Sequence, residues 1–150
     1  MNLEENPIYQ ASIILLEHAR QNKPLALEFA KNCPDKSFLK EWCTIRVASA
    51  RRSGHSVAIA ELTHLFKCPV VIFFNQHQAK ILKEYTTMNP NTISITMRKL
   101  HKLGKILEKN PVDCIFIDIA SLWSSTRIDT LYLIAQSLAK NPEFFIMMFE

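Results

Sequence analysis

The chain has 150 residues, of which 48% are hydrophobic and 21% are charged, and its formal net charge is +4. These proportions are those of a soluble globular protein, and no apolar run approaches the roughly 20 residues that span a bilayer. The mild positive charge permits contact with nucleic acid or another acidic partner but does not require one.

Targeting and redox features are sparse. The first six residues carry two glutamates and no basic stretch, unlike a secretory signal, so we expect a cytoplasmic location. The cysteines form no CxxC pair and have no histidine at zinc-ligand spacing. We therefore expect no disulfide framework and interpret the cysteines as small hydrophobic residues. They are Cys33, Cys43, Cys68 and Cys114.

The chain begins with a helical region. Apolar periodicity and proline positions predict helices over residues 8–21, 24–32 and 35–42, with Pro24 opening the second and Pro34 ending it. Beyond this region strand and helix patterns alternate. Strands are expected over residues 43–48, 69–74, 92–96, 114–117 and 144–149, and helices over 54–66, 76–85, 98–109 and 128–140.

This alternation predicts an α/β protein: a three-layer α/β/α arrangement around a mostly parallel five-stranded sheet, preceded by N-terminal helices. We expect one domain over residues 1–150, with residues 1–42 packed on a core formed by residues 43–150. Ligands of such sheets bind at the carboxyl ends of the strands. The segments that follow strands are 49–56, 75–77, 96–97 and 118–121.

The first of these segments matches part of a phosphate-binding loop. It lies between a strand and a helix, as the pattern GxxxxGK[ST] requires. Gly54 would let the backbone approach a phosphate, backbone amides would hold the anion, and the Ser56 hydroxyl would reach Mg²⁺. His55 replaces the lysine and, with a reference pKa of about 6.5, is mostly neutral at neutral pH. The candidate loop comprises Ser49, Ala50, Arg51, Arg52, Ser53, Gly54, His55 and Ser56.

A second motif follows the strand over residues 114–117. Asp118 ends this apolar run, as the metal-binding aspartate of a nucleotide hydrolase does, so Ser56 and Asp118 are the predicted Mg²⁺ ligands. Ile119 stands where a glutamate would activate the attacking water, and an isoleucine accepts no proton. The competing interpretations are an ordinary strand-to-helix turn for the loop and a helix-capping or turn residue for Asp118.

With these motifs the chain resembles the RecA-like ATPase core of phage terminase large subunits and superfamily-two helicases. The resemblance covers residues 42–149 and includes the Arg51–Ser56 loop, the Pro69–Leu82 segment and the Thr92–Leu100 segment. It implies a P-loop NTPase fold, of the kind that phages and mobile elements encode, with ATP and Mg²⁺ as ligands. His55 and Ile119 depart from the family pattern and imply that nucleotide binding is weak or lost.

Three functions remain open. The leading hypothesis is a catalytically impaired P-loop NTPase-like protein that acts through a protein or nucleic-acid partner. The second is an active ATPase in which Arg51 or Arg52 replaces the missing lysine. The third is a nucleic-acid-binding module that uses these arginines and the basic residues between Arg98 and Lys109.

Overall fold

The computed structural model describes residues 6–48 and 55–150. Within these ranges five strands form one sheet, in the order β1-β5-β4-β2-β3, and every neighbouring pair is parallel. The strands are β1 (Thr44–Val47), β2 (Pro69–Phe73), β3 (Ile93–Thr96), β4 (Cys114–Ile117) and β5 (Phe145–Phe149). The helices are α1 (Pro7–Phe29), α2 (Asp35–Phe38), α3 (His55–Leu62), α4 (Gln76–Tyr85), α5 (Leu103–Lys109) and α6 (Ser125–Ala135).

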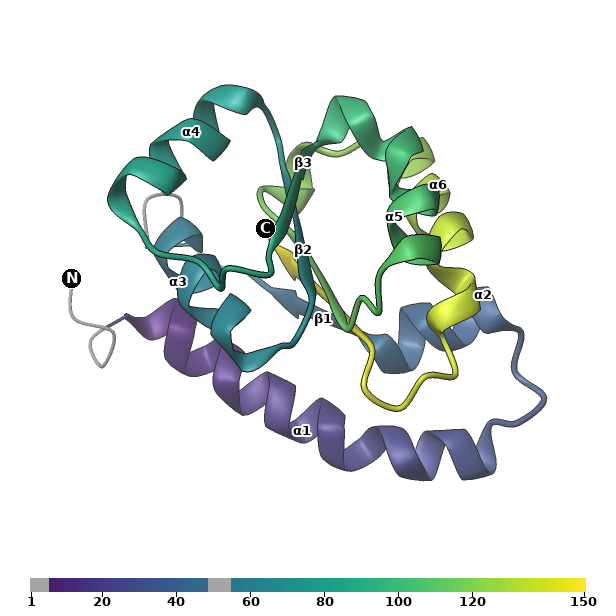
Figure 1. Cartoon of the computed structure of the whole chain (residues 1–150). Coiled ribbons are helices and arrows are strands. Elements are labelled where there is room, and N and C mark those ends of the chain that lie inside the picture. Colours follow the sequence, from purple (N-terminus) through teal and green to yellow (C-terminus); the bar gives the residue numbers. More distant parts are fainter. Residues whose placement is uncertain (1–5, 49–54) are drawn as a thin grey trace.

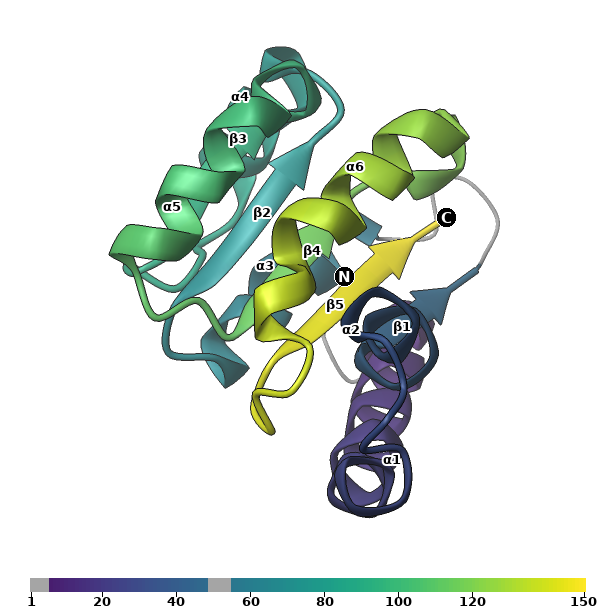
Figure 2. The ribbon, with the colours of Figure 1, turned by 90° about the vertical axis from the view of Figure 1, so that its right-hand side faces the viewer.

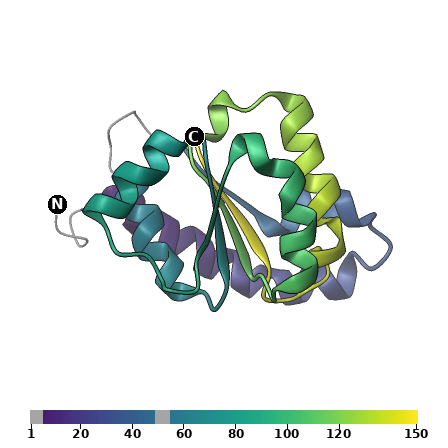
Figure 3. The same ribbon diagram turned by 45° about the horizontal axis from the view of Figure 1, so that its top comes forward.

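Helices cover both faces of the sheet (Figures 1 and 3). The connections β1-α3-β2 and β2-α4-β3 run toward the β3 edge, and their helices share one face. The connections β3-α5-β4 and β4-α6-β5 run back across the sheet, and their helices share the other face. Right-handed crossovers require this division, because the direction of travel decides the face. Figure 2 shows the strands pointing the same way, so their carboxyl ends share one edge.

The central strands are apolar on both sides, as buried parallel strands must be. All residues of β2, β4 and β5 are buried, and alternate residues belong to two separate cores. One core contains Ile72, Ile117 and Met148 under α5 and α6. The other contains Phe116 under α3, together with Cys114, a buried free thiol that packs as a small hydrophobic residue. The predicted α/β class with a five-stranded parallel sheet is confirmed.

The predicted helix boundary at Pro24 is wrong, because α1 continues through this proline to Phe29. An interior proline costs a helix about 3 kcal/mol. Tertiary contacts on both sides of Pro24 offset this cost. Before the proline, Leu16 is buried in the core beside α3, and the fully buried Lys23 donates from Nζ to the Phe144 carbonyl at 2.6 Å. After the proline, Ala26 is buried in the other core. Packing against two distant segments thus keeps α1 continuous.

The prediction of one continuous basic helix over residues 98–109 is also wrong, because two helical segments of different type cover this range. A 3₁₀ helix spans Met97–Lys102, with non-helical backbone angles at Lys99, and α5 follows it. The apolar spacing explains the division. Met97, Leu100 and Leu103 are buried at intervals of three residues, which matches the three-residue turn of a 3₁₀ helix.

A helix that crosses a bilayer needs about 20 predominantly apolar residues. In the part of the chain that the structure describes, no helix combines enough length with enough apolar character to cross a membrane.

Lys23 provides a test of the α1 packing. We expect Lys23→Ala to lower the free energy of unfolding by about 2–4 kcal/mol, because it leaves a cavity and an unpaired buried carbonyl at Phe144. Urea denaturation followed by circular dichroism measures this change. The matched control is Lys31→Ala, at an exposed lysine, which should change stability by less than about 0.5 kcal/mol. Equal effects of the two substitutions would contradict the role given to Lys23.

Candidate functional site

A cavity of about 580 Å³ lies at the carboxyl edge of the sheet, where β2, β4 and β5 end. We call it the Asp118 cavity. The start of α3 contributes its first three residues to the wall, and the segments after β2 and β4 contribute most of the others. Its lining residues are His55, Ser56, Val57, Phe74, Asn75, Gln78, Asp118, Ile119, Ser121, Leu122 and Glu150.

Asp118 is the buried charged group of this cavity, with only 2% of its surface exposed. Removal from water raises the pKa of its carboxyl to about 6, although hydrogen bonds from the Ile119 backbone N–H and the Ser56 hydroxyl act in the opposite direction. The Ser56 contact joins the start of α3 to the end of β4. The two residues predicted as Mg²⁺ ligands therefore line the same cavity, close enough for the hydroxyl to influence the carboxyl.

The backbone turns sharply directly after Asp118. Ile119 has φ 55° and ψ 51°, and it is the only non-glycine residue with positive φ among the residues described. This left-handed conformation is unfavourable for a β-branched side chain and costs of the order of 1–3 kcal/mol. The turn places the Ile119 N–H against the Asp118 carboxylate. Among the described residues, the backbone strain is thus located beside the most buried carboxylate.

Two amide side chains at the start of α4 complete the polar wall. Asn75 caps the helix, and its Oδ1 accepts a hydrogen bond from the Gln78 backbone N–H at 2.9 Å. The Gln78 side-chain oxygen is buried and has no hydrogen-bond partner among the residues that the structure describes. A buried oxygen without a donor is uncommon in folded proteins and is suited to accept a cation or a ligand hydrogen.

These oxygens fit the requirements of Mg²⁺. This ion prefers oxygen ligands and binds through one or two carboxylates together with substrate phosphates. Asp118 supplies one carboxylate, Ser56 a hydroxyl and Gln78 a carbonyl oxygen. In the described ranges no three histidine, cysteine or acidic residues gather as a metal cage. A phosphate-bound Mg²⁺ does not need such a cage.

His55 lies at the start of α3, at the position that a lysine occupies in a phosphate loop. Burial lowers the pKa of its imidazole below the ordinary value of 6.5. Its ring lies 6.1 Å from that of Phe149, measured between centroids. At neutral pH the imidazole is therefore mostly uncharged, and it does not supply the permanent positive charge of a lysine.

The predicted site residues divide into two groups. Ser49, Ala50, Arg51, Arg52, Ser53 and Gly54 lie outside the described residues. His55, Ser56 and Asp118 lie together in the cavity wall, with Asn75, Ile119 and Ser121 from the other predicted segments.

Sequence reasoning missed Phe74, Gln78 and Glu150. The Glu150 carboxylate pairs with Arg46 at 2.6 Å, which ties β5 to β1. Its position after a predicted strand was a usable signal, because every strand of a parallel sheet ends at this edge. Gln78 carried no such signal, since it lies inside a predicted helix.

The raised pKa of Asp118 predicts a defined pH dependence. The folded state holds this proton more tightly than the unfolded chain, so the stabilisation is complete below about pH 4 and is lost as the pH rises through about 6. We expect the unfolding free energy of Asp118→Asn, relative to wild type, to increase by about 2 kcal/mol between about pH 4 and pH 7. Urea denaturation at each pH measures it.

The matched control is Asp129→Asn. Asp129 is exposed, and the neighbouring Lys40 and Lys36 lower its pKa. This variant should show no gain in relative stability over the same pH range. A constant difference between Asp118→Asn and wild type would contradict the raised pKa of Asp118.

No family model matches the chain, and a search of curated proteins found no match. The residues that line the Asp118 cavity are therefore the basis for inferring a function.

Proposed function

We propose that this chain is a P-loop NTPase-like protein with impaired catalysis, which binds the phosphates of a nucleotide together with Mg²⁺ at the Asp118 cavity. One observation carries the proposal: Ser56 and Asp118 line the same cavity, and the Ser56 hydroxyl lowers the pKa of the Asp118 carboxyl. Ser56 lies in the first turn of α3, the helix after β1, and Asp118 follows β4, which lies two positions from β1 in the sheet. A phosphate loop and a metal-binding aspartate require this proximity.

The cavity residues would share the work of binding. Asp118, with a pKa of about 6, is mainly ionised at neutral pH and would supply the negative charge for the cation. The Ser56 hydroxyl would turn its lone pairs toward the same ion, and the Gln78 carbonyl oxygen is close enough to line the same space. Mg²⁺, when bound, would offset the charge of the phosphates.

Two groups that catalysis needs are absent from their expected positions. The neutral, short imidazole of His55 supplies no permanent charge to the transferred phosphate. Ile119 has no group that can accept a proton from water. Binding without efficient hydrolysis follows from these two side chains. The protein would then act through a protein or nucleic-acid partner rather than through turnover.

Isothermal titration with ATP, ADP and GTP, with and without Mg²⁺, tests the nucleotide site. We expect weak binding that depends on Mg²⁺ and that Asp118→Ala removes. His55→Lys should strengthen binding about tenfold or more, which corresponds to about 1.4 kcal/mol for a restored charge contact. Asp129→Ala is the matched control, since it removes an exposed carboxylate outside the cavity lining.

Three other results would change the proposed function. Binding that Asp118→Ala leaves unchanged would overturn the site. Multiple-turnover hydrolysis that Asp118→Ala abolishes would overturn the assignment of impaired catalysis. If Arg51→Ala or Arg52→Ala also abolished that turnover, the chain would be an active ATPase with an arginine in the role of the lysine.

A further inference from the structure

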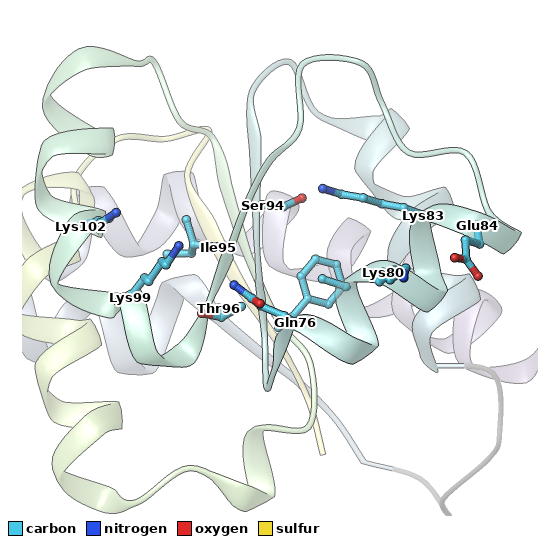
Figure 4. A pocket seen from close by; sticks show the side chains of 11 residues that line it. Gln76, Lys80, Lys83, Glu84, Ser94, Ile95, Thr96, Lys99 and Lys102 are labelled. Atoms are coloured by element: carbon cyan, nitrogen blue, oxygen red, sulfur yellow. The ribbon is translucent and has the colours of Figure 1, made fainter.

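A second hollow lies at the β3 edge of the sheet, away from the Asp118 cavity. It has a volume of about 610 Å³ and lies between α4 and the 3₁₀ helix Met97–Lys102. We call it the edge groove. Figure 4 shows it with β3 running between the two helices. Its lining residues are Phe73, Gln76, Ala79, Lys80, Lys83, Glu84, Ser94, Ile95, Thr96, Lys99 and Lys102.

Positive charge reaches the groove from both sides. Lys80 and Lys83 come from α4, and Lys99 and Lys102 come from the 3₁₀ helix. All four side chains are exposed, and none forms an ion pair with a carboxylate of the described residues. Glu84 is the single acidic residue in the lining, and in Figure 4 it lies farther from β3 than Lys80 does. The groove therefore favours an anionic occupant.

The floor of the groove is the open edge of β3. Among the described strands β3 pairs with β2 alone, through the register Val70↔Ile93 to Phe73↔Thr96. Half of the backbone N–H and C=O groups in such an edge strand point away from the sheet, where another strand can bind them. Figure 4 places Ser94 on the side of Lys83 and Ile95 on the side of Lys99 and Lys102.

Edge strands are commonly protected by charges on the strand itself. β3 reads Ile-Ser-Ile-Thr and carries none. The lysines stand on the flanking helices instead. Such an arrangement leaves the strand available but selects by charge which segment can approach it.

We propose that the edge groove binds an acidic segment of a partner protein, which adds to the sheet as a strand next to β3. Main-chain hydrogen bonds to β3 would supply affinity, and carboxylates reaching the lysines on both sides would supply selectivity. A second copy of this chain is disfavoured, because pairing of two β3 edges would bring the lysines of both copies together. This inference does not depend on the proposed nucleotide site.

Nucleic acid is the competing anionic occupant. Proteins that hold single strands without sequence preference stack the bases on exposed aromatic rings. The edge groove has one aromatic lining residue, Phe73, and its side chain is fully buried. An open strand edge is also better matched to a peptide backbone than to sugar and phosphate. These two observations favour an acidic peptide.

Fluorescence anisotropy with a labelled peptide of about eight residues, long enough for one strand, tests the proposal. The probe repeats Glu-Glu-Val-Val, so that an added strand directs carboxylates to both of its faces. We expect it to bind the full chain, and we expect the double variant Lys80→Glu/Lys102→Glu to weaken binding at least about tenfold. The matched control is Lys105→Glu/Lys109→Glu. It makes the same change of charge at exposed lysines outside the groove and should leave the affinity within about threefold of wild type.

The backbone contribution is tested separately. A probe with the same sequence, methylated on alternate backbone nitrogens, should lose most of its affinity, because the methyl groups remove the ladder donors. Equal binding of both probes would overturn strand addition, and equal weakening by the two double variants would overturn the site. Tighter binding of oligo-dT than of the peptide, lost in Lys80→Glu/Lys102→Glu, would assign the groove to nucleic acid. Asp118→Ala should still bind the peptide, which separates this proposal from the nucleotide site.

Discussion

The contact between Ser56 and Asp118 is the interaction on which the candidate site depends. It connects the first turn of α3 with the end of β4, although 61 intervening residues and the strand β5 separate the two segments. Both side chains reach it because every strand of a parallel sheet ends at the same edge. Burial strengthens the effect of this contact on the carboxylate, because few hydrogen-bond donors replace the water that the carboxylate has lost.

The strained turn at Ile119 belongs to the same arrangement. A left-handed isoleucine is retained only where surrounding contacts hold it, and strain of this kind gathers at functional sites. Here the strained residue donates its backbone N–H to Asp118. The same carboxylate thus has a raised pKa, a strained neighbour and a serine donor. An ordinary strand-to-helix turn does not need a buried carboxylate, a strained backbone and a serine donor at the same place.

The region at the carboxyl end of β4 and the region at the open edge of β3 differ in charge. The Asp118 cavity presents a buried carboxylate with amide and hydroxyl oxygens, whereas the edge groove presents four exposed lysines beside an open strand. β2 lies between β3 and β4, and α4 contributes to both regions: Gln78 to the cavity, Lys80 and Lys83 to the groove. A change in the position of α4 would therefore affect both regions.

Local patterns in the sequence determined the elements of this fold. Two-sided apolar runs such as residues 114–117 identified the buried strands, and the position of Asp118 directly after one of them placed it at the carboxyl edge. Tertiary structure decided which elements became neighbours. It placed β5 between β1 and β4 and kept α1 helical through Pro24. It also brought the lysines of α4 to the same groove as Lys99 and Lys102. The physical reason is range: backbone periodicity acts within a few residues, whereas burial and strand pairing join residues far apart in the chain.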